Sequence, residues 1–239
     1  MRRFPIQLRL YVLFIFFSGS IVRAQEAGMI KIPPTSAIQN YLSETNEYSA
    51  LFNGKIETPY DRTFENHPYL ETDRYVQGVL CYNGVVYNDI FMRLDLFRDE
   101  FTVFSPHKPY RIILENEKFN YAVLNGLTLV FSPERSKYML LIHDGAYPFV
   151  KQYRLAVKED YSALTFTIIR SFRIQTQYFI YIDAKAYPVK NKNALLKLFP
   201  DRKKELNDYA KQHKLNFRTQ FEQSVIALIN HYESMQEHR

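Results

Sequence analysis

Three acidic residues near the middle of the chain, Asp95, Asp99 and Glu100, are the clearest group that could do chemistry. Paired carboxyl groups can hydrolyse a glycosidic bond when about 5–9.5 Å separates them, one acting as acid and the other as base or nucleophile. Arg93 and Arg98 are interleaved with these acids. Such a mixture is more typical of a charged strand edge and turn, where each ion pair contributes about 0–1 kcal/mol. We therefore predict a structural role for the group and keep hydrolysis as the alternative.

The other residue types that perform chemistry do not form a recognisable constellation. His143 precedes Asp144, but neighbouring side chains of a strand point to opposite faces, and Asp144-Gly145 is typical of a turn. No histidine pair has metal-ligand spacing in a predicted helix or strand. The single cysteine, Cys81, excludes an intrachain disulfide and Cys-rich metal clusters. Glycine-rich phosphate loops, a G-x-S-x-G elbow and an H-E-x-x-H helix do not occur in the sequence.

Tyrosines are the remaining candidates for a binding site, because stacked rings can hold a sugar or a peptide. The residues concerned are Tyr82, Tyr87, Tyr178, Tyr181 and Tyr187. The chain has 19 Tyr, 19 Phe and no Trp, so packing on a half-buried sheet is the preferred interpretation of these tyrosines. The sequence therefore predicts no catalytic residue, no cofactor and no metal ligand.

Residues 1–24 have the pattern of a secretory signal peptide. Arg2 and Arg3 precede an apolar run, Leu10–Phe17, which is shorter than the roughly 20 residues that span a bilayer. Val22 and Ala24 have compact side chains at the third and first positions before the predicted cut, which is typical of a cleavage site. We expect processing between Ala24 and Gln25, export to the periplasm or cell surface, and no stable membrane span after cleavage.

Loss of this leader changes the charge balance. The whole chain carries 31 basic and 25 acidic residues, a net charge of +6. The leader holds Arg2, Arg3, Arg9 and Arg23 and no acid, so the mature chain has a net charge of +2. This near balance argues against a nucleic-acid partner.

The mature chain divides into an irregular segment, residues 25–74, and a single domain, residues 75–239. Prolines and polar residues dominate the first segment, which has at most a short helix. Three dipeptides typical of two-residue hairpin turns follow in the second: Asn83-Gly84, Asn125-Gly126 and Asp144-Gly145. Alternating apolar residues flank them, so strands are predicted at Val76–Tyr82, Val85–Tyr87, Asp89–Phe97, Phe101–Phe104, Arg111–Leu114, Phe119–Leu124, Leu127–Phe131, Tyr138–Ile142, Phe149–Val157, Leu164–Phe172 and Gln175–Ile182.

The apolar period becomes helical from about residue 193. Helices are predicted at Ala194–Phe199, at Arg202–His213 with Asp201 as N-cap, and from Thr219 to about residue 235. Short connections join antiparallel neighbours. The fold class is therefore α+β: an antiparallel sheet, sandwich-like or curled like a barrel, followed by C-terminal α-helices.

Two pairs of stretches resemble uncharacterised exported β-rich proteins of the Bacteroidetes that have a helical C-terminus. They are Tyr82–Tyr87 with Arg93–Glu100, and Leu195–Phe199 with Ile226–Tyr232. The resemblance implies an exported sheet-and-helix protein and supplies no activity or site. Together these patterns favour a non-catalytic protein of the bacterial envelope that binds an envelope protein or a small ligand. A secreted, glycosidase-like hydrolase with dispersed carboxylates is the alternative, and the oligomeric state stays open.

Overall fold

The computed structural model describes residues 51–60, 64–104, 110–164 and 166–237. The predicted signal peptide, its cleavage site at Ala24 and Gln25, and residues 25–50 lie outside the described residues. The processing site therefore stays a prediction.

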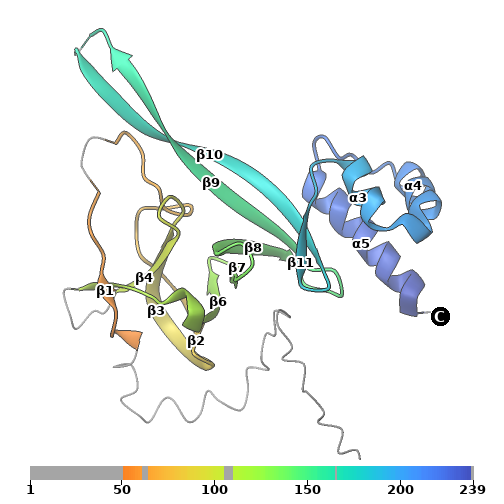
Figure 1. Ribbon diagram of the computed structural model, residues 1–239, viewed down its shortest axis with the longest axis horizontal. Helices are drawn as coiled ribbons and strands as arrows, with labels where there is room; N and C mark the ends of the chain where they lie inside the picture. The colour runs from red at the N-terminus through yellow and green to blue at the C-terminus, as the bar shows by residue number, and fades with distance from the viewer. Residues whose placement is uncertain (1–50, 61–63, 105–109, 165, 238–239) are drawn as a thin grey trace, which may run out of the picture.

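One antiparallel sheet and a group of C-terminal helices form the described chain (Figure 1), which confirms the predicted α+β class. The strands are β1 (Lys55–Ile56), β2 (Val76–Tyr82), β3 (Val85–Asp95), β4 (Glu100–Phe104), β5 (Arg111–Ile113), β6 (Phe119–Leu124), β7 (Leu127–Ser132), β8 (Lys137–His143), β9 (Phe149–Ser162), β10 (Thr167–Ile182) and β11 (Lys185–Pro188). Their order in the sheet is β1-β5-β4-β3-β2-β6-β7-β8-β9-β10-β11. Most neighbours in the sheet are thus consecutive in sequence, as short hairpin connections require.

Two of the three predicted hairpin turns form as expected. Asn83 and Gly84 have φ of 53° and 77°, and Asn125 and Gly126 have φ of 48° and 77°. The third prediction is wrong, because residues 144–148 make a longer connection and Gly145 is absent from the positive-φ residues. A Cβ atom at Gly145 would lie 2.6 Å from Glu233 Oε1, so glycine here permits a close approach of the last helix.

The largest departure from the predicted strands is the length of β9 and β10, which have 14 and 16 residues. The predicted interruption near Arg173 does not occur, and Phe172 to Gln175 continue one ladder with β9. The short strand β11 was not predicted, because its turn uses Asp183 and Ala184 at positive φ in place of Asn-Gly. The long hairpin projects from the sheet (Figure 1).

The first eight strands curl over their own core. Phe101 of β4 lies 4.9 Å from Phe119 of β6 and 5.6 Å from Tyr138 of β8, measured between ring centroids. These strands are not neighbours in the sheet, so the contacts require it to bend back on itself. The bend encloses an apolar cluster, the curled core, which contains Met92 and Leu94. The curled alternative is therefore the correct one, although the sheet is not closed.

The helices lie at the β11 end of the sheet (Figure 1), and Ile142 packs against both their core and the curled core. They are α3 (Lys192–Leu198), α4 (Lys203–Gln212) and α5 (Phe221–Glu237), with short 3-10 turns at η1 (Asn116–Lys118) and η2 (Pro200–Arg202). Leu195, Leu206 and Leu228 pack with Phe149 and Ile180 of the sheet. None of the described helices combines the length and apolar character needed to cross a membrane.

Helix capping differs from the prediction at one point. Asn191 caps α3 by accepting a hydrogen bond from the Ala194 N–H at 2.9 Å. Asp201, the predicted N-cap of the second helix, instead lies within η2, and α4 has no side-chain cap. The Tyr232 hydroxyl donates to the Asp201 carboxylate at 3.3 Å, so this acid fastens α5 to the preceding turn.

Candidate functional site

The three acids singled out from the sequence lie at the β3–β4 turn, where they shape the chain. Asp95 and Glu100 are directly opposite in register. The Asp95 side chain accepts hydrogen bonds from the backbone N–H groups of Phe97 at 2.9 Å and Arg98 at 2.8 Å. Asp95 is only 1% exposed, and burial raises the pKa of its carboxyl group. A turn-forming acid sealed in this way is poorly placed to meet a substrate.

Asp99 connects the same turn to β8. Its carboxylate lies 3.2 Å from Lys137 Nζ and accepts a hydrogen bond from the Tyr138 N–H at 3.3 Å. Burial raises the pKa of Asp99 in spite of the nearby ammonium group. Asp95 therefore shapes the turn and Asp99 fixes it to β8. This arrangement agrees with the charged turn that the sequence predicts.

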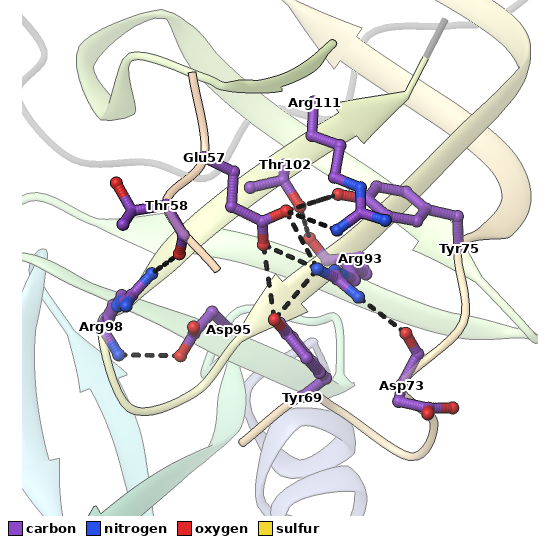
Figure 2. Close-up of polar contacts among 10 residues, drawn as sticks. All are labelled: Glu57, Thr58, Tyr69, Asp73, Tyr75, Arg93, Asp95, Arg98, Thr102 and Arg111. Carbon is purple, nitrogen blue, oxygen red and sulfur yellow. Dashed lines mark hydrogen bonds and ion pairs between the residues drawn. The ribbon is translucent and has the colours of Figure 1, made fainter. Parts of the chain in front are cut away.

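A buried cluster beside this turn, which the sequence did not reveal, is centred on Arg93 (Figure 2). The Arg93 Nη2 atom donates to both carboxylate oxygens of Glu57, at 2.7 and 2.9 Å, and to the Tyr69 hydroxyl at 2.9 Å. Its Nη1 atom donates to the Asp73 carbonyl at 2.7 Å. The Glu57 and Arg93 side chains are 2% and 8% exposed. We call these residues, with Tyr75 and Thr102, the arginine cluster.

Two tyrosine rings enclose the guanidinium group. Its carbon lies 3.7 Å from the ring centroid of Tyr69 and 4.5 Å from that of Tyr75. The Tyr75 hydroxyl donates to Glu57 Oε2 at 3.0 Å, and burial is the main reason that the pKa of Tyr75 rises to about 12. Burial also raises the pKa of Tyr69. Both phenols are therefore neutral at physiological pH and serve as packing and hydrogen-bonding groups.

The arginine cluster joins residues 55–60 and 64–75 to the outer side of β3 and β4. Arg98 extends the connection by donating to the Thr58 carbonyl and by stacking 3.9 Å from the centroid of the Tyr60 ring. Each charge is held by groups of the chain itself, which is typical of a structural clamp. Within the described residues, no three potential ligands of the His, Cys, Asp and Glu types gather to hold a metal ion.

The other candidate residues are separated by the fold. His143 Nε2 lies 3.5 Å from Glu233 Oε2 of α5. Tyr82 and Tyr87 belong to the curled core, Tyr178 packs on Phe149 and Phe221, and the Tyr181 hydroxyl donates to Ser132 on the opposite face at 2.6 Å. Tyr187 is half-buried on β11. The five tyrosines thus do not form one platform. Cys81 is fully buried, as expected.

A second unpredicted feature is exposed apolar surface on the projecting hairpin. We call residues 153–164 and 166–177 the arm (Figure 1). Its large apolar side chains that are 39–94% exposed are Val157, Tyr161, Leu164, Phe166, Ile168 and Ile174. Grouped apolar surface of this kind marks interaction sites more often than scattered exposed residues do. Period-two alternation predicts strands but does not say whether anything covers their apolar face.

The base of the arm is anchored on the body of the protein. The Phe172 ring stacks on Phe64 at 4.4 Å and contacts Phe97 at 5.3 Å between centroids. The Asn66 side chain exchanges two hydrogen bonds with the Phe172 backbone, at 2.7 and 2.9 Å. Phe64 also forms an isolated parallel β-bridge with Arg170 of β10, and the Glu65 N–H donates to the Arg170 carbonyl at 2.9 Å.

No family model, curated protein or solved structure matches this chain.

Proposed function

We propose that the chain is an exported, non-catalytic binding protein of the bacterial envelope, and that the arm is its surface for a protein partner. The observation that carries this proposal is the exposed apolar surface of the arm. The arm is held at its base by Asn66 and Phe64, so its outer part is presented at a defined position. An anchored, apolar projection suits protein association better than a mobile loop does.

The chemistry of the acids supports a non-catalytic role. Hydrolysis by a carboxylate pair needs both groups at the surface of a cleft, with room for a sugar ring. Asp95 and Glu100 are opposite in register, which is the one observation that favours the hydrolase alternative. The burial of Asp95 and its two backbone hydrogen bonds argue against it. Turnover of a glycan by the purified protein, abolished in Asp95→Asn, would support that alternative.

Export is part of the proposal and rests on the sequence of residues 1–24. Cell fractionation in the native host, followed by N-terminal sequencing, should recover an envelope protein that begins at Gln25. A cytosolic species that still begins at Met1 would contradict export.

The binding surface can be tested by photo-crosslinking in cells. A photoreactive phenylalanine is placed at Tyr161 or at Ile174 on the arm, and at Tyr110 as the control. Tyr110 is 50% exposed and lies beside β5 on the body. We expect one discrete protein adduct from each arm position and none from Tyr110. Absence of adducts at the arm, or equal adducts at all three positions, would refute the proposal.

A further inference from the structure

We propose that the partner of the arm is a second copy of this chain, and that the β9 edges of the two copies pair in antiparallel fashion with Val157 at the two-fold axis. This inference rests on the proposed role of the arm as a binding surface. It adds the identity of the partner, the strand that binds it and the register of the pairing.

The first support is the open edge of β9. Strand β8 pairs with β9 only from Phe149 to Lys151. Strand β10 occupies the other edge along the whole length of β9. Over the described part of the chain, residues 154–160 therefore have no strand on their β8 side. Unpaired N–H and C=O groups on such an edge are a template for a further strand.

The second support is the order of charges along this edge. When an edge pairs with itself about a two-fold axis, residues equally distant from the axis face one another. With the axis at Val157, Arg154 of each copy lies opposite Asp160 of the other, so the pairing gains two oppositely charged pairs. An axis at Ala156 would place Arg154 opposite Lys158, and an axis at Lys158 or Glu159 would place like charges opposite each other. Among these four axis positions, the charges therefore favour the register centred on Val157.

The same register unites the apolar faces of the two arms. Val157 lies opposite its counterpart, and Tyr161 lies opposite Tyr153. Tyr161 is already the cross-strand partner of Ile168 on β10. The side chains of Val157, Tyr161 and Ile168 are all exposed in one copy, and the pairing gives Val157 and Tyr161 apolar neighbours from the second copy.

The remaining charges of the edge are compatible with this pairing. Glu159 is held by Arg170 at 2.7 Å across β9 and β10. Asp160 lies 2.8 Å from Lys158 of its own strand. Its carboxylate has further acceptor positions for an incoming Arg154, because an ionised carboxyl group accepts several hydrogen bonds. On each side of the axis, Lys158 and Asp160 of one copy and Arg154 of the other then form a row of alternating charges.

A disulfide test reports the register directly. Directly opposed strand residues have Cβ atoms about 4.5–5.5 Å apart, so Val157→Cys should give a covalent dimer under mild oxidation. Glu159→Cys is the control on the same exposed face. In the proposed register its two copies lie about 14 Å apart, which is too far for a disulfide. Cys81 is fully buried and does not compete. Equal crosslinking of both variants, or none in Val157→Cys, would overturn the register.

Charge reversal tests the same pairing without cysteines. Because the axis repeats each contact, Arg154→Glu or Asp160→Arg changes two pairs at once. We expect each to weaken dimerisation about tenfold or more in sedimentation equilibrium. Combining the two should restore it, because the opposite charges face each other again. Both side chains are exposed, so folding measured by circular dichroism should not change. A double variant as weak as the single ones would overturn the inference.

The outcomes separate this inference from the proposed function. A monomeric chain whose arm crosslinks to a different protein would refute the second copy and leave the binding role intact. Co-sedimentation of the monomer with anionic vesicles, lost in Ile168→Asp, would assign the arm to a membrane and refute both. A wild-type dimer that persists when the arm is altered would refute the arm as its interface.

Discussion

Glu57→Gln should be one of the most damaging single-atom changes in this protein. The substitution keeps the shape of the side chain and removes its charge. Arg93 then stays buried at 8% exposure, between the rings of Tyr69 and Tyr75, without its carboxylate partner. Breaking a buried ion pair from one side costs about 3–5 kcal/mol, because the remaining charge is left uncompensated.

The position of Glu57→Gln within this range follows from the contacts. The Gln amide oxygen can still accept one of the two hydrogen bonds that Arg93 Nη2 donates at 2.7 and 2.9 Å. Stacking against the tyrosines is also retained, and such contacts stabilise a cation by about 0.5–2 kcal/mol. We therefore expect a loss near the lower end, about 3 kcal/mol in the free energy of unfolding.

Urea unfolding at neutral pH measures this loss, and Glu159→Gln provides a matched control. Glu159 pairs with Arg170 at the same 2.7 Å, but that pair lies at the surface of the arm. Its loss should cost about 0–1 kcal/mol. Adding Arg93→Met to Glu57→Gln should lower the free energy of unfolding little further, because the substitution removes the unpaired buried guanidinium charge. If Glu57→Gln costs no more than Glu159→Gln, the reasoning about burial is wrong.

Three further predictions concern side chains whose contacts are equally specific. Burial raises the pKa of Asp95, so ionisation of Asp95 destabilises the folded state as the pH rises above the ordinary carboxyl pKa. The free energy of unfolding of Asp95→Asn should therefore increase relative to that of the wild type between about pH 3 and about pH 7. A difference in unfolding free energy that does not change with pH would contradict this. The pKa of Glu222 is shifted in the opposite direction. Burial acts to raise its pKa, but hydrogen bonds from Lys151 and Tyr178 outweigh burial and lower it, so Glu222→Gln should lose about 1 kcal/mol near pH 7 and nothing near pH 3 in urea titrations. Equal losses at both pH values would exclude the ion pair. Asn66→Ala removes two hydrogen bonds to Phe172, so amide exchange should accelerate at the base of the arm, while exchange in α5 stays unchanged; uniform acceleration would indicate global destabilisation instead.

Local signals in the sequence predicted the elements that depend on neighbouring residues. Asn83-Gly84 and Asn125-Gly126 form their turns because both positions tolerate positive φ. The apolar residues Ile90, Met92 and Leu94 share a buried face, and the C-terminal helices follow the helical period. Asp144-Gly145 misled the prediction, because that glycine serves a contact with Glu233 that is distant in sequence.

The arginine cluster could not be predicted for the same reason. Glu57 and Arg93 are far apart in sequence, and a segment with prolines and no period gives no indication of which strand it covers. The alternation that places Arg93 and Asp95 on one face of β3 suggests a solvated edge, yet both are buried. Residues 57–60 and 64–75 cover that face, and the charges become internal only because these parts of the chain return to it.

The arginine cluster and the arm are parts of one arrangement. The segment that Glu57 fixes to Arg93 continues through Tyr60 and Phe64 to Asn66, which bind the arm at Phe172. Phe97, from the turn that Asp95 shapes, reaches the same ring. The buried charges therefore define where the arm leaves the body, which is a requirement for any partner that must meet a fixed strand edge. On this reasoning Glu57→Gln, although remote from Val157, should also weaken crosslinking through Val157→Cys, because an arm released at its base presents its edge in many orientations.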